Sequence, residues 1–116
     1  MKATLTNYRQ SPRKVRLVAN AVKGKSVADA DTVLTYMVKR GALPMQKLIQ
    51  SAAANAVQAG ADASTLIVKN VEVNKGLVMK RSMPRAMGRA TPINKRLSHV
   101  TVTLAQGEVK KSKKTK

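Results

Sequence analysis

The sequence of 116 residues contains no cysteine, phenylalanine or tryptophan, and only two tyrosines. The absence of cysteine excludes disulfide bonds and thiolate metal ligands. One histidine and five acidic residues also leave few side chains from which a metal site can be built. Aliphatic side chains and alanine must therefore fill the core of what, at this length, we expect to be one domain.

Acidic residues are scarce beside basic ones: 23 lysines and arginines give a net charge of +18. Such a charge repels itself in the compact state unless a polyanion screens it, so nucleic acid, an anionic membrane surface and an acidic protein are the candidate partners. The start, MKATLTNYRQ, lacks the apolar core of a signal peptide, and no stretch approaches the roughly 20 apolar residues of a membrane span. We therefore expect a cytoplasmic protein.

Groups for catalysis are also sparse. His99 has no cysteine or acidic residue near it in the sequence, and neither Ser11, Ser82 nor Ser98 stands in a nucleophile-elbow pattern. The six glycines are scattered singly, so no glycine-rich phosphate loop is present. The sequence predicts no enzyme, no cofactor and no metal site, and we interpret His99 as a residue that meets polar partners or RNA.

Apolar residues recur at helical spacing in three consecutive segments. Ser11–Pro12 suits an N-cap with proline at the first helical position, and Ser26 has Asp29 three residues later as a cap partner. The expected helices lie between Ser11 and Gly24, between Ser26 and Gly41 with a C-terminus at Lys39–Arg40, and from about Pro44 to Ala59.

Alternating residues predict strands on both sides of a long basic segment. Residues 75–96 contain seven basic residues, no acidic residue and two prolines. Connections of this length are uncommon in small domains unless they are functional or disordered, and the flanking strands should pair antiparallel. We therefore predict an extended hairpin, 75–98, within a single α+β domain of residues 1–106, followed by a disordered lysine-rich tail, 107–116. The expected strands are 3–8, 66–75 and 100–104.

Methionine and arginine alternate at every second position from Met79 to Arg89. On an extended strand, this pattern places long basic and soft apolar side chains on one face, which suits a nucleic-acid wall. The alternatives are a solvated flexible loop and an amphipathic helix. Pro84 makes the helix costly by ~3 kcal/mol.

A second group of cations surrounds the start of the first helix, at Arg9, Arg13, Lys14 and Arg16. These charges oppose the positive end of the helix dipole, a cost that bound phosphate would reverse. The alternative is an ordinary solvated helix face.

The kind of nucleic acid does not follow from composition. Two aromatic residues are too few for the stacking platforms of RNA-recognition or single-strand-binding folds, so shape and phosphate contacts must dominate. A DNA-bending architectural protein, which inserts a basic β arm into the minor groove, fits the same features. A membrane-surface domain fits less well, because the alanine-rich helical stripes are needed for the core.

Four segments occur in the order and spacing of bacterial-type large-subunit ribosomal protein L22, and the chain resembles that family over residues 3 to about 105. The segments are SPRKVRLVANAVKGKSV, SAAANAV, MKRSMPRAMGRA and KRLSHVTVTL. The resemblance implies three helices packed on a small three-stranded antiparallel sheet, with a long protruding basic hairpin. The chain differs from the family pattern at Asn74, Lys75, Met87 and Pro92.

The resemblance further implies a structural, non-catalytic constituent of the large ribosomal subunit that supports its assembly. Its partners would be 23S rRNA, ribosomal protein L4 at the constriction of the polypeptide exit tunnel, and the nascent polypeptide, with no homo-oligomer and no membrane. Carried onto this sequence, the tip that lines the tunnel would be Ser82, Met83, Pro84, Arg85, Ala86, Met87, Gly88 and Arg89. The rRNA-binding residues would be Arg9, Arg13, Lys14, Arg16, Lys80, Arg81, Arg85, Arg89, Lys95, Arg96 and His99.

Overall fold

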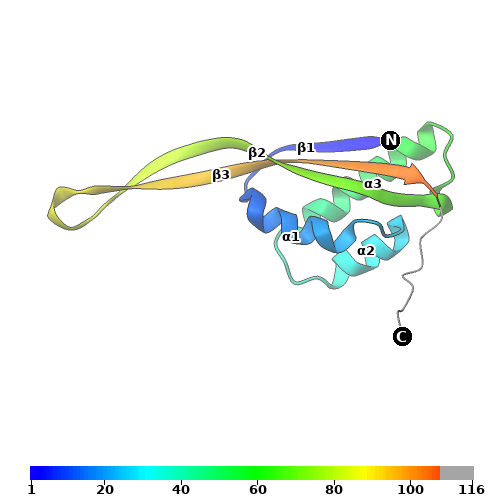
Figure 1. Ribbon diagram of the computed structural model, residues 1–116, viewed down its shortest axis with the longest axis horizontal. Coiled ribbons are helices and arrows are strands. Elements are labelled where there is room, and N and C mark those ends of the chain that lie inside the picture. Colours follow the sequence, from blue (N-terminus) through cyan, green and yellow to red (C-terminus); the bar gives the residue numbers. More distant parts are fainter. Residues whose placement is uncertain (108–116) are drawn as a thin grey trace.

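The computed structural model describes residues 1–107 as three helices and three strands, with two short 3₁₀ turns (Figure 1). The predicted lysine-rich tail lies outside the described residues, except for Gly107. The elements are β1 (Lys2–Tyr8), α1 (Pro12–Val22), α2 (Val27–Tyr36), α3 (Ala42–Gln58), η1 (Ala63–Thr65), β2 (Leu66–Pro84), η2 (Ala86–Gly88) and β3 (Ala90–Gln106).

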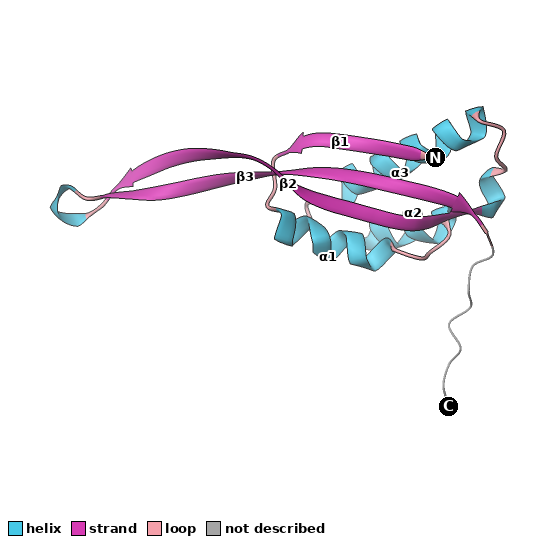
Figure 2. Cartoon of the chain, turned by 45° about the horizontal axis from the view of Figure 1, so that its top comes forward, coloured by secondary structure: helices cyan, strands magenta, loops and turns pink. Residues whose placement is uncertain are grey.

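The three strands form one antiparallel sheet in the order β1-β3-β2. The helices pack together on one face of this sheet, and β2 and β3 continue beyond them as a two-stranded hairpin (Figure 2). The hairpin gives the molecule a length of 61 Å along its longest axis. The predicted α+β fold with a protruding hairpin is thereby confirmed.

The core is aliphatic, as the lack of aromatic residues requires. Val100, Val102 and Leu104 of β3 are buried against the helices, because alternate residues of a strand point to the same face. Ala52 and Ala56 of α3 are fully buried. Their small side chains allow α3 to lie close to the sheet.

The predicted starts of the first two helices are confirmed, and the third helix begins at Ala42, slightly before the expected start at about Pro44. Contacts explain the end of the first helix. Ser26 accepts a hydrogen bond from the Asp29 backbone N–H at 3.2 Å. Gly24 adopts a φ of +78°, which favours glycine after a helix. Its N–H donates to the Val68 carbonyl, and the Val68 N–H donates to the Lys25 carbonyl, both at 2.8 Å. These two bonds join the turn after α1 to β2.

The predicted end of the second helix at Lys39–Arg40 is wrong, because α2 ends at Tyr36. Met37 is extended (φ −78°, ψ 124°) and packs against the core, whereas Val38 is 96% exposed. The chain must reverse here to lay α3 beside α2.

The hairpin leaves the domain at a β-bulge. Two residues of β2, Gly76 and Leu77, stand opposite one residue of β3, Leu97. A Cβ at Gly76 would lie 3.2 Å from the Leu97 carbonyl group, so glycine permits this close approach. The extra residue reverses the alternation of β2. Odd-numbered residues lie on the helix side from Val71 to Lys75, and even-numbered residues lie on that side from Val78 onward. The flanking pairs are Lys75 with Ser98 and Val78 with Arg96.

Candidate nucleic-acid interface

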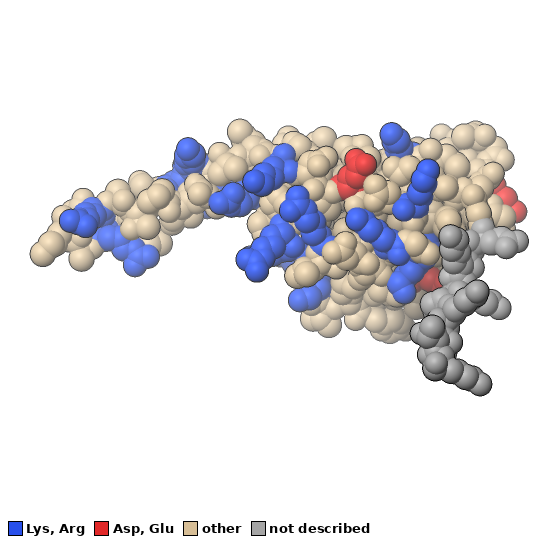
Figure 3. All heavy atoms as spheres, in the orientation of Figure 1, with Lys and Arg blue, Asp and Glu red and all other residues tan. Residues whose placement is uncertain are grey.

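Basic side chains gather on the hairpin and where the hairpin meets the domain (Figure 3). On β2, Met79, Arg81 and Met83 share one face, because the strand pairing runs without a break from Val78 to Pro84. The other face of the same strand carries Lys80, Ser82 and Pro84. The predicted alternation of long side chains on one face with small ones on the other therefore holds on this strand, apart from Lys80.

The tip is a tight turn whose side chains are all exposed. The Arg85 backbone N–H donates to the Arg89 carbonyl at 2.7 Å, and Ala86–Gly88 forms a 3₁₀ turn between them. Met87 lies in the left-handed region (φ 63°), and its side chain is 97% exposed. The tip therefore presents arginine, methionine and small residues outward, and contacts nothing of the domain core.

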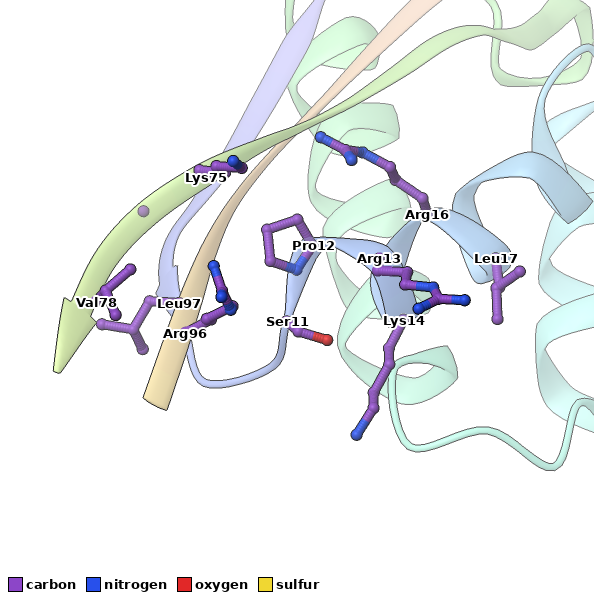
Figure 4. A pocket seen from close by; sticks show the side chains of 11 residues that line it. Ser11, Pro12, Arg13, Lys14, Arg16, Leu17, Lys75, Val78, Arg96 and Leu97 are labelled. Carbon is purple, nitrogen blue, oxygen red and sulfur yellow. The ribbon is translucent and has the colours of Figure 1, made fainter. Parts of the chain in front are cut away.

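Three of the predicted helix cations line a groove between α1 and the base of the hairpin (Figure 4). Its volume is about 490 Å³. The cations come from both sides of the groove: Arg13, Lys14 and Arg16 from α1, Lys75 from β2 and Arg96 from β3. The apolar lining consists of Pro12, Leu17, Val78 and Leu97. We call this space the apolar-floored groove.

A second groove adjoins the apolar-floored groove at the corner between β1 and α1. Its volume is about 600 Å³, and its lining is more polar. It shares Ser11, Lys14, Arg96 and Leu97 with the apolar-floored groove. Its further lining residues are Arg9, Gln10, Arg40, Met79, Asn94 and Lys95. We call this space the polar groove.

Two of the predicted binding residues also have structural contacts. The Arg16 guanidinium donates to the Val73 carbonyl at 3.1 Å, which ties α1 to β2. His99 is half-buried on β3, and its Nδ1 accepts the Asn7 backbone N–H at 3.2 Å. With Nδ1 as the acceptor, the neutral ring carries its proton on Nε2. Asn7 itself is in the left-handed region (φ 55°), within the bulge of β1 opposite His99.

The acidic side chains of the described chain line neither groove. Asp31 of α2 accepts hydrogen bonds from Gln46 and Gln50 of α3. Asp62 accepts the Ser64 backbone N–H at 3.0 Å, and this bond holds the pKa of its carboxyl below the ordinary value of 3.8. Both grooves are therefore lined by positive charge alone.

Six of the predicted rRNA-binding residues line the two grooves: Arg9, Arg13, Lys14, Arg16, Lys95 and Arg96. Lys80 lines neither groove but pairs with Asn94 of the polar groove. Arg81, Arg85 and Arg89 lie farther along the hairpin, and His99 lies within the sheet. Sequence reasoning did not assign Arg40, Lys75 or Leu17 to a site. For Arg40 and Lys75, the general excess of basic residues was the only feature of the sequence that could have indicated a binding role. For Leu17, the corresponding feature was an apolar residue on an exposed helix face.

The arrangement of the cations is typical of a nucleic-acid-binding protein. Within residues 1–107, no three metal-ligating side chains cluster, and no helix of that part is long and apolar enough to cross a membrane. The cations instead line a protruding hairpin and two grooves at its base.

Comparison with known proteins identifies the family. Residues 3–105 match the family described as Ribosomal protein L22p/L17e. The chain is 51% identical to the large ribosomal subunit protein uL22 of Geobacter sulfurreducens, over 89% of this chain and 94% of that protein. It is 50% identical to the protein of the same name from Mesoplasma florum, over 93% and 97% of the two chains. The chain belongs to the ribosomal protein L22 family, whose members are non-enzymatic structural proteins of the large ribosomal subunit.

Proposed function

We propose that this protein binds 23S rRNA in the cytoplasm, supports assembly of the large subunit, and lines the polypeptide exit tunnel with its hairpin. The globular domain is held by rRNA through Arg9, Arg13, Lys14 and Arg16. The tip, residues 82–89, helps to form the tunnel constriction with ribosomal protein L4 and faces the nascent polypeptide.

The observation that carries this proposal is the shape and charge of the hairpin. Residues 80–90 are exposed on both faces, although a two-stranded ribbon in water has little independent stability. Arginine and lysine along the ribbon supply the forked and point-charge donors that bind phosphates. A surrounding wall of rRNA would neutralise these charges and hold the ribbon extended.

The same features support the position of the tip. Ser82, Ala86 and Gly88 are small, so they leave space for a passing peptide, while Arg85 and Arg89 can be anchored by rRNA. Substitution of Ala86 by Trp should therefore still permit incorporation into large subunits but narrow the passage and alter elongation arrest.

Crosslinking from a photoreactive residue tests the proposal. We would place it at Met87, which is 97% exposed at the tip, and at Val38 as a control, which is 96% exposed on the domain. Large subunits that carry a stalled, radiolabelled nascent chain should give a crosslink from position 87 and none from position 38. Co-sedimentation with the large subunit but no crosslink at 87 would reject the tunnel position. Co-purification with DNA in place of the large subunit would favour an architectural DNA-binding protein.

A further inference from the structure

We propose that the apolar-floored groove receives one unstacked base of an rRNA strand whose phosphates lie in the polar groove. The inference rests on the proposed rRNA binding and adds how one nucleotide is held. It names a site on the globular domain, separate from the hairpin tip.

The lining of the apolar-floored groove supports a base as the occupant. Pro12 and Leu97 are buried beneath it, while Leu17 of α1 is 61% exposed at its side. A volume of about 490 Å³ lies within the range of roughly 300–1,000 Å³ that is typical of small-ligand sites. A phosphate alone gains nothing from aliphatic walls, whereas the flat face of a base is stabilised by apolar contact.

The charge around the groove indicates that this base belongs to a polyanion. Five cations line the groove, and the acidic side chains of the described chain do not. Arginine guanidinium planes can also stack on a base, so Arg13 and Arg96 are suited to contact either the base or the phosphate of the same nucleotide.

The position of the polar groove supplies the path of the strand. The two grooves meet at Ser11, Lys14 and Arg96, which line both. Ser11 occupies the N-cap position of α1, but its hydroxyl makes no cap hydrogen bond and is available to a ligand. A phosphate at this shared ridge would contact Lys14 and Arg96, and the base attached to its sugar would turn into the apolar-floored groove.

Binding of two matched probes tests the proposal. The first is an oligoadenylate of about ten nucleotides, and the second is an abasic oligomer with the same number of phosphates. We expect the full-length protein to bind the oligoadenylate about tenfold more tightly than the abasic oligomer, a ratio typical of one well-buried base. The substitution Leu17→Ala should reduce this ratio to about threefold or less and leave the affinity for the abasic oligomer unchanged, because it removes apolar surface but no charge.

Leu43→Ala is the matched control, because Leu43 of α3 is also a leucine, is 59% exposed and lines neither groove. It should leave the ratio at its original value. In methyl NMR spectra, the oligoadenylate should shift the signals of Leu17, Val78 and Leu97 but not that of Leu43, and the abasic oligomer should shift none of these methyl groups strongly.

The outcomes separate this inference from the proposed function. Equal affinity for the two probes, or a ratio that Leu17→Ala leaves unchanged, would overturn the base-binding groove and leave RNA binding intact. Failure of both probes to bind at low salt would overturn RNA binding itself.

Discussion

The hydroxyl of Ser98 donates a hydrogen bond to the backbone carbonyl of Gln10 at 2.6 Å, although the two residues lie 88 positions apart in the sequence. Ser98 is the one polar side chain that is fully buried in the described part of the chain. Its bond fixes the β1–α1 corner against β3. Because both grooves lie at this corner, the bond helps to hold the cations on either side of it.

We predict that Ser98→Ala lowers the free energy of unfolding by about 1–3 kcal/mol, because it leaves the Gln10 carbonyl without this donor. Urea denaturation followed by circular dichroism measures the change. Thr101→Ala, at a half-exposed position of the same strand, should stay within about 0.5 kcal/mol. Equal effects of the two substitutions would contradict a special role for the Ser98 bond.

Affinity for RNA should depend steeply on salt. Each phosphate neutralised contributes a slope of roughly 0.7–0.9 in log K against log salt. We expect Lys14→Gln or Arg96→Gln to reduce the slope by about one phosphate, because each side chain lies at the ridge between the grooves. Lys47→Gln on α3 should not change it. Filter binding to a 23S rRNA transcript at several salt concentrations provides the measurement, and a slope that all three variants share would contradict the assignment.

The hairpin should be dispensable for folding. Replacement of residues 79–95 by Asn-Gly leaves Val78 paired with Arg96 beside a two-residue turn. The core cluster contains none of the removed residues, so the shortened protein should keep its helical circular dichroism and melt cooperatively, with a midpoint shifted by only a few degrees. Loss of the cooperative transition would mean that the hairpin contributes to the core.

The third helix should tolerate a charge on one face only. Ala52→Asp buries an unpaired carboxylate at a position with no exposure, so it should destabilise the fold by more than about 3 kcal/mol. Val57→Asp on the same helix should cost less than about 1 kcal/mol, since its side chain is half exposed. Thermal denaturation of the two variants would show the difference, and similar midpoints would mean that α3 is rotated from its described position.

The sequence predicted the elements and the hairpin because their signals are local. The caps at Ser11 and Ser26 and the glycine after α1 mark helix ends within a few residues. The length, charge and prolines of residues 75–96 exclude a core element without any knowledge of the tertiary fold. The resemblance to a ribosomal family then supplied the three-stranded sheet, which these local signals did not define.

Other features could not be predicted because they depend on tertiary contacts. The end of α2 accompanies the reversal of the chain into α3, which leaves Val38 exposed. The apolar stripe of α3 predicts Ala53 as a buried residue in the middle of the helix, whereas the structure buries Ala52 and Ala56 completely and Ala53 only in part. The grooves combine Arg40 from the α2–α3 connection, Lys75 from β2 and Leu17 from α1, and no spacing in the sequence relates these positions.

The bulge at Gly76–Leu77 makes the alternation of side chains along the hairpin independent of the alternation in the core part of β2. Because it adds one residue to β2 alone, the pattern that buries Val71 and Val73 does not dictate which hairpin side chains face which way. Removal of one bulge residue would leave each hairpin side chain opposite its present partner. Removal of one residue from the continuous pairing between Val78 and Arg81 would instead exchange Arg81 and Met83 with Ser82 and Pro84 across the ribbon. The length of the arm between the bulge and the tip is therefore more tightly constrained than the identity of most of its residues. An insertion or deletion there should be less well tolerated than a substitution.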